Sequence, residues 1–392
     1  MFGSAVIFAS SGDVQADRGR VSSALAPLPV ALSQPGLGLR SPALMELTPA
    51  SLRRAREHAS RRAKHDSAQY TIVDAPGAGG GVGQGTWLLG LNSSSAAVGY
   101  YIDEAGLSHG FERMSDGTYI TIDVGKISTA LYTLNDKGLV GGRFVDRKTG
   151  KCPGFIQTPK DKLKKFDPPD DSGFWPYDCL SDGPLNNSGT LVGGYTDAAG
   201  AAHSFLRLKN GALSEFDPPG ITNYSSALGI SNAGEIAGGY CDSTCHGYVR
   251  ATDGTFTEFD PPNSAWAVAG PINEEGEIEG DFQASNLVYR GFIREPDGSF
   301  VVYDAPGAGT GPYQGTLGFS GINKDGTVAG DYFDAGGYPH GYTRAKDGTF
   351  TEFDVPGSIA TYPGFFGIND SGVTGGFFID QYGSFHGFLR TP

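Results

Sequence analysis

The feature that most constrains the fold is one sequence unit that the chain repeats seven times. Its closing aspartate recurs every 43 to 50 residues. These aspartates are Asp74, Asp123, Asp167, Asp217, Asp260, Asp304 and Asp354. A fixed period of this length indicates an array of identical supersecondary units.

Within each unit the apolar residues alternate or come in short runs, which favours β-strands over helices. Residues 235–240 and 255–259 of the clearest copy, 216–260, are two such segments. An Asn-x-x-Gly turn and an Asp-Gly or Asn-Gly turn separate the strands, and the Gly supplies a positive φ. Four short strands repeated seven times predict a seven-bladed β-propeller. An open β-solenoid is the second interpretation.

The two ends of the repeat are complementary. The last copy stops at residues 386–390 without a fourth strand, and residues 70–74 are a fourth strand with nothing before it. We therefore predict that strand 70–74 pairs into the final blade and closes the ring, which would hide both sheet edges. The propeller then spans residues 70–392, after a leader of residues 1–69.

Charge divides the chain into the same two parts. The formal charge is −14, but residues 1–69 hold nine Lys or Arg against five Asp or Glu, so the repeat carries about −18. An acidic ring repels nucleic acid and anionic membranes. Glycan or protein ligands remain as expected partners, with no nucleic acid, and we expect a monomer.

The leader has two apolar runs, at residues 5–9 and 24–32, and neither is long enough to span a bilayer. Either run resembles a weak secretory signal. Residues 48–64 predict a short basic helix capped by Thr48. We interpret residues 1–69 as a flexible, solvated leader, and a membrane-surface or partner-binding helix is the alternative.

The four cysteines predict two disulfides. Cys241 and Cys245 flank the turn between a second and a third strand, and Cys152 and Cys179 occupy loops that open on one face. A four-cysteine zinc site is the alternative, but the spacing differs from the usual Cys-x₂-Cys pairs. Two disulfides indicate an oxidising, extracellular, periplasmic or cell-surface location.

Histidine recurs at the start of the third strand. The residues concerned are His109, His203, His246, His340 and His386. With the closing aspartates they form a ring of His and Asp on one face, which suggests either a metal or acid/base site or a structural role. A group repeated in nearly every blade does the same task each time, so we favour the structural role. No metal or cofactor is predicted.

Aromatic residues mark the variable loops that lead into the first strands. They are Trp87, Phe174, Trp175, Tyr177, Tyr224, Trp266, Tyr313 and Tyr362. Aromatic faces beside polar groups suit sugar rings, so these loops are the candidate ligand-binding face. The alternative is that the same side chains enter the first strands and pack between blades.

The motifs His-Gly-Phe-x-Arg, Asp-Gly-Thr-Phe and Ile-Asn-x-x-Gly-x-Ile-x-Gly resemble the bacterial extracellular repeats of the HAF type. Residues 203–205, 246–248 and 386–388 stand where those repeats have His-Ala-Phe, and residues 272–280 and 322–330 match the Ile-Asn motif. This chain has Gly or Ser in place of the usual Ala. The resemblance covers residues 70–392 and implies a secreted or surface propeller-like array with no shared activity.

These observations favour a secreted or surface propeller that binds a ligand or partner, such as a glycan, through aromatic loops, with no catalysis evident. The alternative is a lyase or hydrolase that acts on polysaccharide in a pocket at the propeller mouth. An enzyme requires acidic residues that break the repeat and converge. Asp170, Asp171 and Asp178, in the longest loop, are the candidates that the sequence offers.

Overall fold

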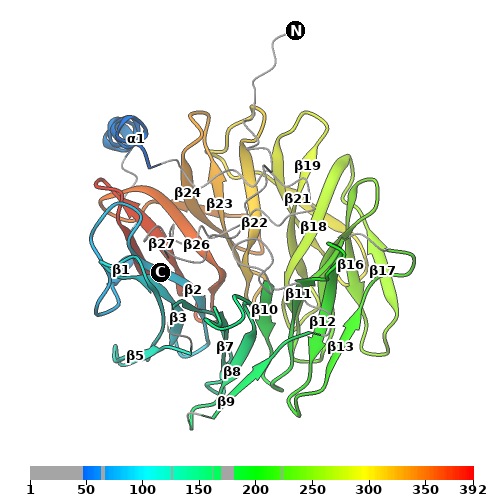
Figure 1. Ribbon diagram of the computed structural model, residues 1–392. Helices are drawn as coiled ribbons and strands as arrows, with labels where there is room; N and C mark the ends of the chain where they lie inside the picture. Colours follow the sequence, from blue (N-terminus) through cyan, green and yellow to red (C-terminus); the bar gives the residue numbers. More distant parts are fainter. Residues whose placement is uncertain (1–46, 63–66, 125–126, 161, 169–180, 222–223) are drawn as a thin grey trace, which may run out of the picture.

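The computed structural model describes residues 47–62, 67–124, 127–160, 162–168, 181–221 and 224–392, and it is an all-β protein with one helix (Figure 1). The strands form antiparallel four-stranded blades of a β-propeller, each named here after its first strand. Consecutive strands pair as neighbours within a blade, as the repeat predicted.

The strand bounds follow the repeat. The β2 blade has β2 Gly85–Leu91, β3 Ala97–Ile102, β4 Ser108–Arg113 and β5 Tyr119–Ile122; the β6 blade has β6 Thr129–Leu134, β7 Val140–Phe144, β8 Gly154–Gln157 and β9 Leu163–Phe166; the β10 blade has β10 Ser181–Leu185, β11 Leu191–Thr196, β12 Ala202–Arg207 and β13 Leu213–Phe216; the β14 blade has β14 Tyr224–Ile230, β15 Ile236–Cys241, β16 Cys245–Arg250 and β17 Phe256–Phe259.

The remaining blades complete the array. The β18 blade has β18 Ser264–Ile272, β19 Ile278–Ala284, β20 Tyr289–Arg294 and β21 Phe300–Tyr303; the β22 blade has β22 Gly315–Ile322, β23 Val328–Phe333, β24 Pro339–Arg344 and β25 Phe350–Phe353; the β26 blade has β26 Ser358–Ile368, β27 Thr374–Asp380, β28 Phe385–Thr391 and, from the start of the chain, β1 Gln69–Val73.

Burial falls from the first strand of a blade to the fourth. All seven residues of β2 are buried, whereas three of the four residues of β9 are exposed. The first strands pack on neighbouring blades, which leaves no room for side chains where backbones approach. A Cβ on Gly229 of β14 would lie 2.3 Å from the carbonyl oxygen of Gly270 in β18, so only glycine fits there.

A belt of asparagines joins neighbouring blades. The Asn135 side chain donates to the Asn186 carbonyl at 2.8 Å, and Asn369 near the end of the chain donates to the Asn92 carbonyl at 3.1 Å. Asn92, Asn186, Asn273 and Asn323 make the same contact with the next blade along the chain. The Asn of the Asn-x-x-Gly motif thus links blades as well as shaping its turn.

The two ends of the repeat pair with each other. Strand β1 is antiparallel to β28, with Tyr70 opposite Arg390 and Ile72 opposite Phe388. Val73 is fully buried in this ladder. Strands β2 and β26 also meet, with Gly90 opposite Phe366.

The predicted disulfide between Cys241 and Cys245 is present across the β15–β16 turn. Cys152 is also disulfide-bonded. Its predicted partner, Cys179, lies outside the described residues.

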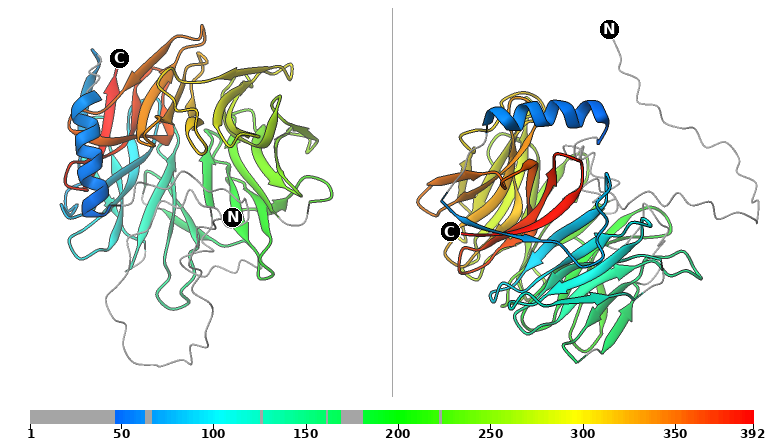
Figure 2. Two further views of the ribbon diagram at one scale, coloured as in Figure 1. Left: turned by 90° about the horizontal axis from the view of Figure 1, so that it is seen from above. Right: turned by 90° about the vertical axis from the view of Figure 1, so that its left-hand side faces the viewer.

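Helix α1 (Pro49–Arg62) lies against the propeller, across the last strands of the chain (Figure 2). Leu52 and Ala55 are buried in one apolar cluster with Trp87, Tyr362 and Phe385. Thr48 caps the helix, since its Oγ1 accepts from the Ser51 amide at 3.2 Å. The basic helix was predicted, but its solvated setting was not correct. Arg53, Arg54 and Arg56 are exposed, whereas Leu52 and Ala55 on the other face of the helix are buried against the propeller.

Among the described residues, no helix is long and apolar enough to cross a membrane.

Candidate functional site

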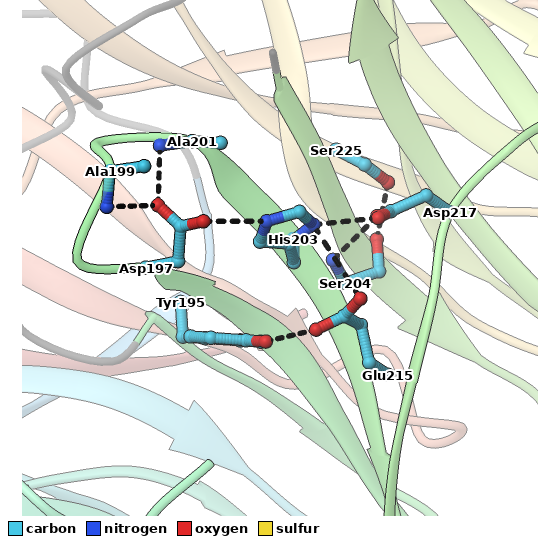
Figure 3. A network of polar contacts seen from close by, with 9 residues as sticks. All are labelled: Tyr195, Asp197, Ala199, Ala201, His203, Ser204, Glu215, Asp217 and Ser225. Atoms are coloured by element: carbon cyan, nitrogen blue, oxygen red, sulfur yellow. Dashed lines mark hydrogen bonds and ion pairs between the residues drawn. The ribbon is translucent and has the colours of Figure 1, made fainter. Parts of the chain in front are cut away.

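The loops between second and third strands and those between blades gather the repeated His and Asp side chains. Figure 3 shows the arrangement around His203 at the start of β12. The His203 Nδ1–H donates to Asp217 Oδ2 at 2.7 Å, and Nε2 lies 3.5 Å from Asp197 Oδ2. The same Asp197 accepts backbone amides of its turn from Ala199 and Ala201, each at 2.8 Å.

The same His–Asp pair recurs in four of the other blades. The contacts are His109 to Asp123, His246 to Asp260, His340 to Asp354 and His386 to Asp74. In the β18 blade Arg290 replaces the histidine and contacts Asp304 at 2.6 Å. In the β6 blade Pro153 stands at this position, and the blade's closing residue is Asp167. We call these His–Asp contacts the lattice.

The lattice ties the third strand to the closing residue of the fourth strand in the β2, β10, β14, β22 and β26 blades, which is the kind of contact that a structural role requires. An aromatic ring of the second strand covers each histidine, as Tyr195 does for His203 and Tyr240 for His246. Burial acts to lower the pKa of His203, but the hydrogen bond and charge of Asp217 outweigh it, so the pKa is raised. The histidine is therefore held as a charged partner of two carboxylates.

Three of the predicted aromatic ligands are buried in first strands. Trp87, Tyr224 and Tyr362 are 3 %, 3 % and 6 % exposed. Trp87 stacks on Phe385 with ring centroids 4.2 Å apart, and Tyr362 lies in the same cluster under α1. The packing alternative describes these three residues, because a side chain so deeply covered offers no face to a ligand from solvent.

Two predicted aromatic residues keep exposed surface, and both precede or begin neighbouring first strands. Trp266 in β18 is partly exposed, and Tyr313, just before β22, is 42 % exposed. Trp175 and Tyr177 lie outside the described residues, as do Phe174, Asp170, Asp171 and Asp178.

Tyr313 has an unusual backbone. Loops 75–86 and 305–316 are nearly the same in sequence and share their internal hydrogen bonds, such as Gly81 N to Gln84 Oε1 and Gly311 N to Gln314 Oε1. Where the first loop has Gly83 at φ 77°, the second has Tyr313 at φ 63°. A bulky residue is strained in this left-handed region, and strain of this kind gathers at functional sites.

A group of acidic residues that breaks the repeat lies in the β18 and β22 blades. Asp281 of β19 and Asp331 of β23 occupy the position at which the β10 and β14 blades have Gly194 and Gly239. Burial and the charge of Asp331 raise the pKa of Asp281. Burial raises the pKa of Asp331 to about 7, although its side chain keeps some contact with solvent.

Buried Tyr289 connects these acids with the exposed aromatic residue. Burial, and then the charges of nearby Asp281 and Tyr313, raise the pKa of Tyr289. Glu279 adds a third carboxylate, which is fully buried and whose Oε2 accepts the Gly321 amide at 2.9 Å. The acids were missed because this position varies between copies, which have Tyr100, Arg143, Gly194, Gly239 and Phe377 there. The available signal was that only two consecutive copies have an acid at this position of the second strand.

Among the residues that the structure describes, two groups of side chains have the composition of metal ligands. One is His203, Glu215 and Asp217 in the lattice, and the other is His58 of α1 with Asp334 and His340. In the first group the Asp217 carboxylate already accepts from the Ser204 amide at 3.1 Å as well as from His203.

Solved structures with similar folds are propellers. A catalytically inactive virginiamycin B lyase from Staphylococcus aureus with quinupristin is 11 % identical, at 83 % coverage of this chain and 100 % of that chain, with a TM-score of 0.54. The propeller domain of the Trilobed protease from Pyrococcus furiosus is 10 % identical at 74 % and 91 % coverage, with a TM-score of 0.52. No protein-family model and no curated protein match the sequence. Identities this low establish the fold and nothing about the ligand.

Proposed function

We propose that this chain is a secreted or surface propeller that binds a ligand at the mouth of the β18 and β22 blades, with Trp266 and Tyr313 as its aromatic contacts. The observation that carries the proposal is the exposed Tyr313 held at positive φ where the sister loop has glycine. A neutral glycan fits best, because a sugar ring stacks on an aromatic face while its hydroxyls bond nearby polar groups.

The acids beside this rim support a polar ligand. Asp281 and Asp331 lie on the second strands of the same two blades, and Tyr289 is near both Asp281 and Tyr313. Carboxyl groups accept hydrogen bonds from sugar hydroxyls, and a protonated carboxyl also donates one. The proposed site therefore combines stacking at its rim with hydrogen bonding farther inside.

We further propose that the blades number seven and form a closed ring. The β1–β28 ladder and the hydrogen bond from Asn369 to the Asn92 carbonyl support this closure, since each joins the two ends of the repeat. The Cys241–Cys245 disulfide and the resemblance to HAF-type repeats support an extracellular or periplasmic location.

Removing either of the rim aromatics should weaken glycan binding without unfolding the protein. The full chain is screened on a glycan and polysaccharide array, and hits are titrated calorimetrically with Tyr313→Ala and Trp266→Ala. Each variant should raise Kd about tenfold or more, because a stacking face is lost. Tyr382→Ala is the matched control, since Tyr382 is 65 % exposed on another blade and should leave Kd unchanged.

Equal affinity in Tyr313→Ala and the wild type would place the ligand elsewhere. A screen with no glycan hit would leave a protein ligand as the better account.

The enzyme alternative is favoured by one observation, the pKa of Asp331 at about 7. A carboxyl group with this pKa exchanges protons near neutral pH, as a general acid or base must. If a bound polysaccharide is shortened by the wild type, Asp331→Asn should stop the shortening while binding persists. Unchanged cleavage in that variant would exclude this acid from catalysis.

A further inference from the structure

The second group of metal-ligand side chains joins the helix to the propeller. Helix α1 carries His58 to the turn between β23 and β24, where its ring stacks on Tyr338 with centroids 4.1 Å apart. There the His58 Nε2 lies 2.8 Å from Asp334 Oδ2, and the His340 Nε2 lies 3.5 Å from the same oxygen. The three ligand atoms lie within 4.8 Å of one another.

Neighbouring groups already orient two of the three side chains. The Nδ1–H of His340 donates to Asp354 Oδ1 at 2.8 Å, which leaves the Nε2 lone pair pointing toward Asp334. Asp334 Oδ1 accepts the amides of Gly336 at 2.8 Å and Tyr338 at 3.0 Å, so Oδ2 is the oxygen turned to the histidines. Metal-binding histidines usually have such a carboxylate behind them.

His58 itself has an unsatisfied nitrogen. Its Nε2 is buried and, among the residues that the structure describes, has no hydrogen-bond partner. The His58 Nε2 therefore lies 2.8 Å from Asp334 Oδ2, but the angle between the two groups is unsuitable for a hydrogen bond. A buried ring nitrogen in this position is costly unless something between it and the carboxylate binds both.

Within the described part of the chain, the other blades lack this arrangement. His109 lies between Asp103 and Asp123, and His246 lies between Asp242 and Asp260, each with one imidazole and two carboxylates. Only in the β22 blade does a residue from outside the repeat bring a second imidazole to a described lattice histidine. The lattice supplies a preformed half of a site, and α1 completes it.

We propose that His58, Asp334 and His340 bind one divalent transition-metal ion of the zinc class. Two imidazole nitrogens and one carboxylate oxygen are a donor set typical of zinc with an open fourth position for water. Tetrahedral zinc places its ligand atoms roughly 3.3 Å apart, given metal–ligand distances of about 2.0 Å. The observed separations of 2.8 and 3.5 Å bracket that value. The absence of any metal site was the expectation from sequence, where His58 stood outside the repeat.

The ion would fasten α1 over the apolar cluster. The side chains of Leu52 and Ala55 are already buried beside Trp87 and Tyr362. A metal bond between His58 and the ring adds a contact that chelators remove. The binding of the helix to the propeller then depends on the concentration of the metal ion. It does not depend on a glycan at the β18 and β22 blades.

Calorimetric titration of Zn²⁺ into the chelator-treated full chain tests the site. We expect about one equivalent with a micromolar or lower Kd, weakened roughly 100-fold or more in His58→Ala because one ligand of three is lost. The matched control is His109→Gln, a lattice histidine without a second imidazole, which should bind as the wild type does. Co²⁺ in place of Zn²⁺ should give the visible absorption of a four-coordinate ion in the wild type and in His109→Gln but not in His58→Ala.

A second readout follows the helix. Trypsin cleaves at Arg53, Arg54 and Arg56, and Zn²⁺ should slow this cleavage in the wild type but not in His58→Ala. Thermal melting confirms that both variants fold. Equal Zn²⁺ affinity in the wild type and His58→Ala, equal losses in His58→Ala and His109→Gln, or no binding at all would each overturn the proposal.

Discussion

A chain that begins at Ala75 should melt about 10 °C or more below one that begins at Ser67. Both lack α1, so the difference isolates strand β1. Its loss leaves the edge of β28 unpaired, removes the fully buried Val73 and breaks the contact between His386 and Asp74. Several kcal/mol lost from a domain of this size lower Tm by about this amount.

Circular dichroism melts of the two chains at equal concentration and pH make the comparison. The shorter chain should also tend to aggregate, because an open strand edge pairs with other molecules. If the two chains melt together, β1 does not hold the ring and the closure is refuted.

Stability should be highest near pH 4 to 5 and fall toward pH 8. Burial raises the pKa of Asp331 to about 7, whereas an unfolded Asp titrates near 3.9. The folded state therefore binds more protons between these values, so the free energy of unfolding decreases as pH rises through that interval. Asp281, whose pKa is also raised, acts in the same direction.

The lattice adds to this trend. The pKa values of His109, His203, His246 and His386 are raised. Their stabilisation is complete below the unfolded value near 6.5 and is lost as pH rises through the folded values. Below pH 4 the opposite applies to Asp103 and Asp197, whose lowered pKa values make protonation destabilising.

The variant Asp331→Asn should flatten this profile. The amide keeps the shape and removes the charge, so at pH 8 the variant should be more stable by about 2–4 kcal/mol, with no difference near pH 4. Denaturant unfolding at both pH values measures this difference in the free energy of unfolding. The control is Asp325→Asn, because Asp325 is an exposed residue of the same blade. If the variant is less stable than the wild type at pH 8, the Asp331 carboxylate is ionised there and stabilised by hydrogen bonds, which would contradict the prediction.

The repeat made the propeller predictable, because a fixed period with strand and turn signals depends on local chemistry. The pairing of residues 70–74 with the last blade followed from the matched incomplete ends, and residues 69–73 of β1 do pair with β28. The Cys241–Cys245 disulfide followed from its place across a hairpin turn. Each of these predictions could be made from the sequence pattern alone, because it depends on the repeat, its ends or a single turn.

The candidate site was less predictable, because it depends on how deeply each side chain is buried and on contacts between residues that are far apart in the sequence. The loop aromatics looked alike in sequence, yet Trp87 and Tyr362 turn inward under α1 whereas Tyr313 turns outward. The pairing of His58 with Asp334 joins residues that no repeat relates. The hydrogen bonds of the Asn belt between blades were not predicted, because the Asn-x-x-Gly turn already accounted for these asparagines.

The central claim is that the lattice holds the fold, while residues that break the repeat carry the function. The most direct test measures ligand Kd and Tm together for His109→Ala and Tyr313→Ala. We predict a lower Tm with unchanged Kd for the first and a raised Kd with unchanged Tm for the second. The reverse pattern, in which the lattice variant loses the ligand and the Tyr313 variant keeps it, would contradict the claim.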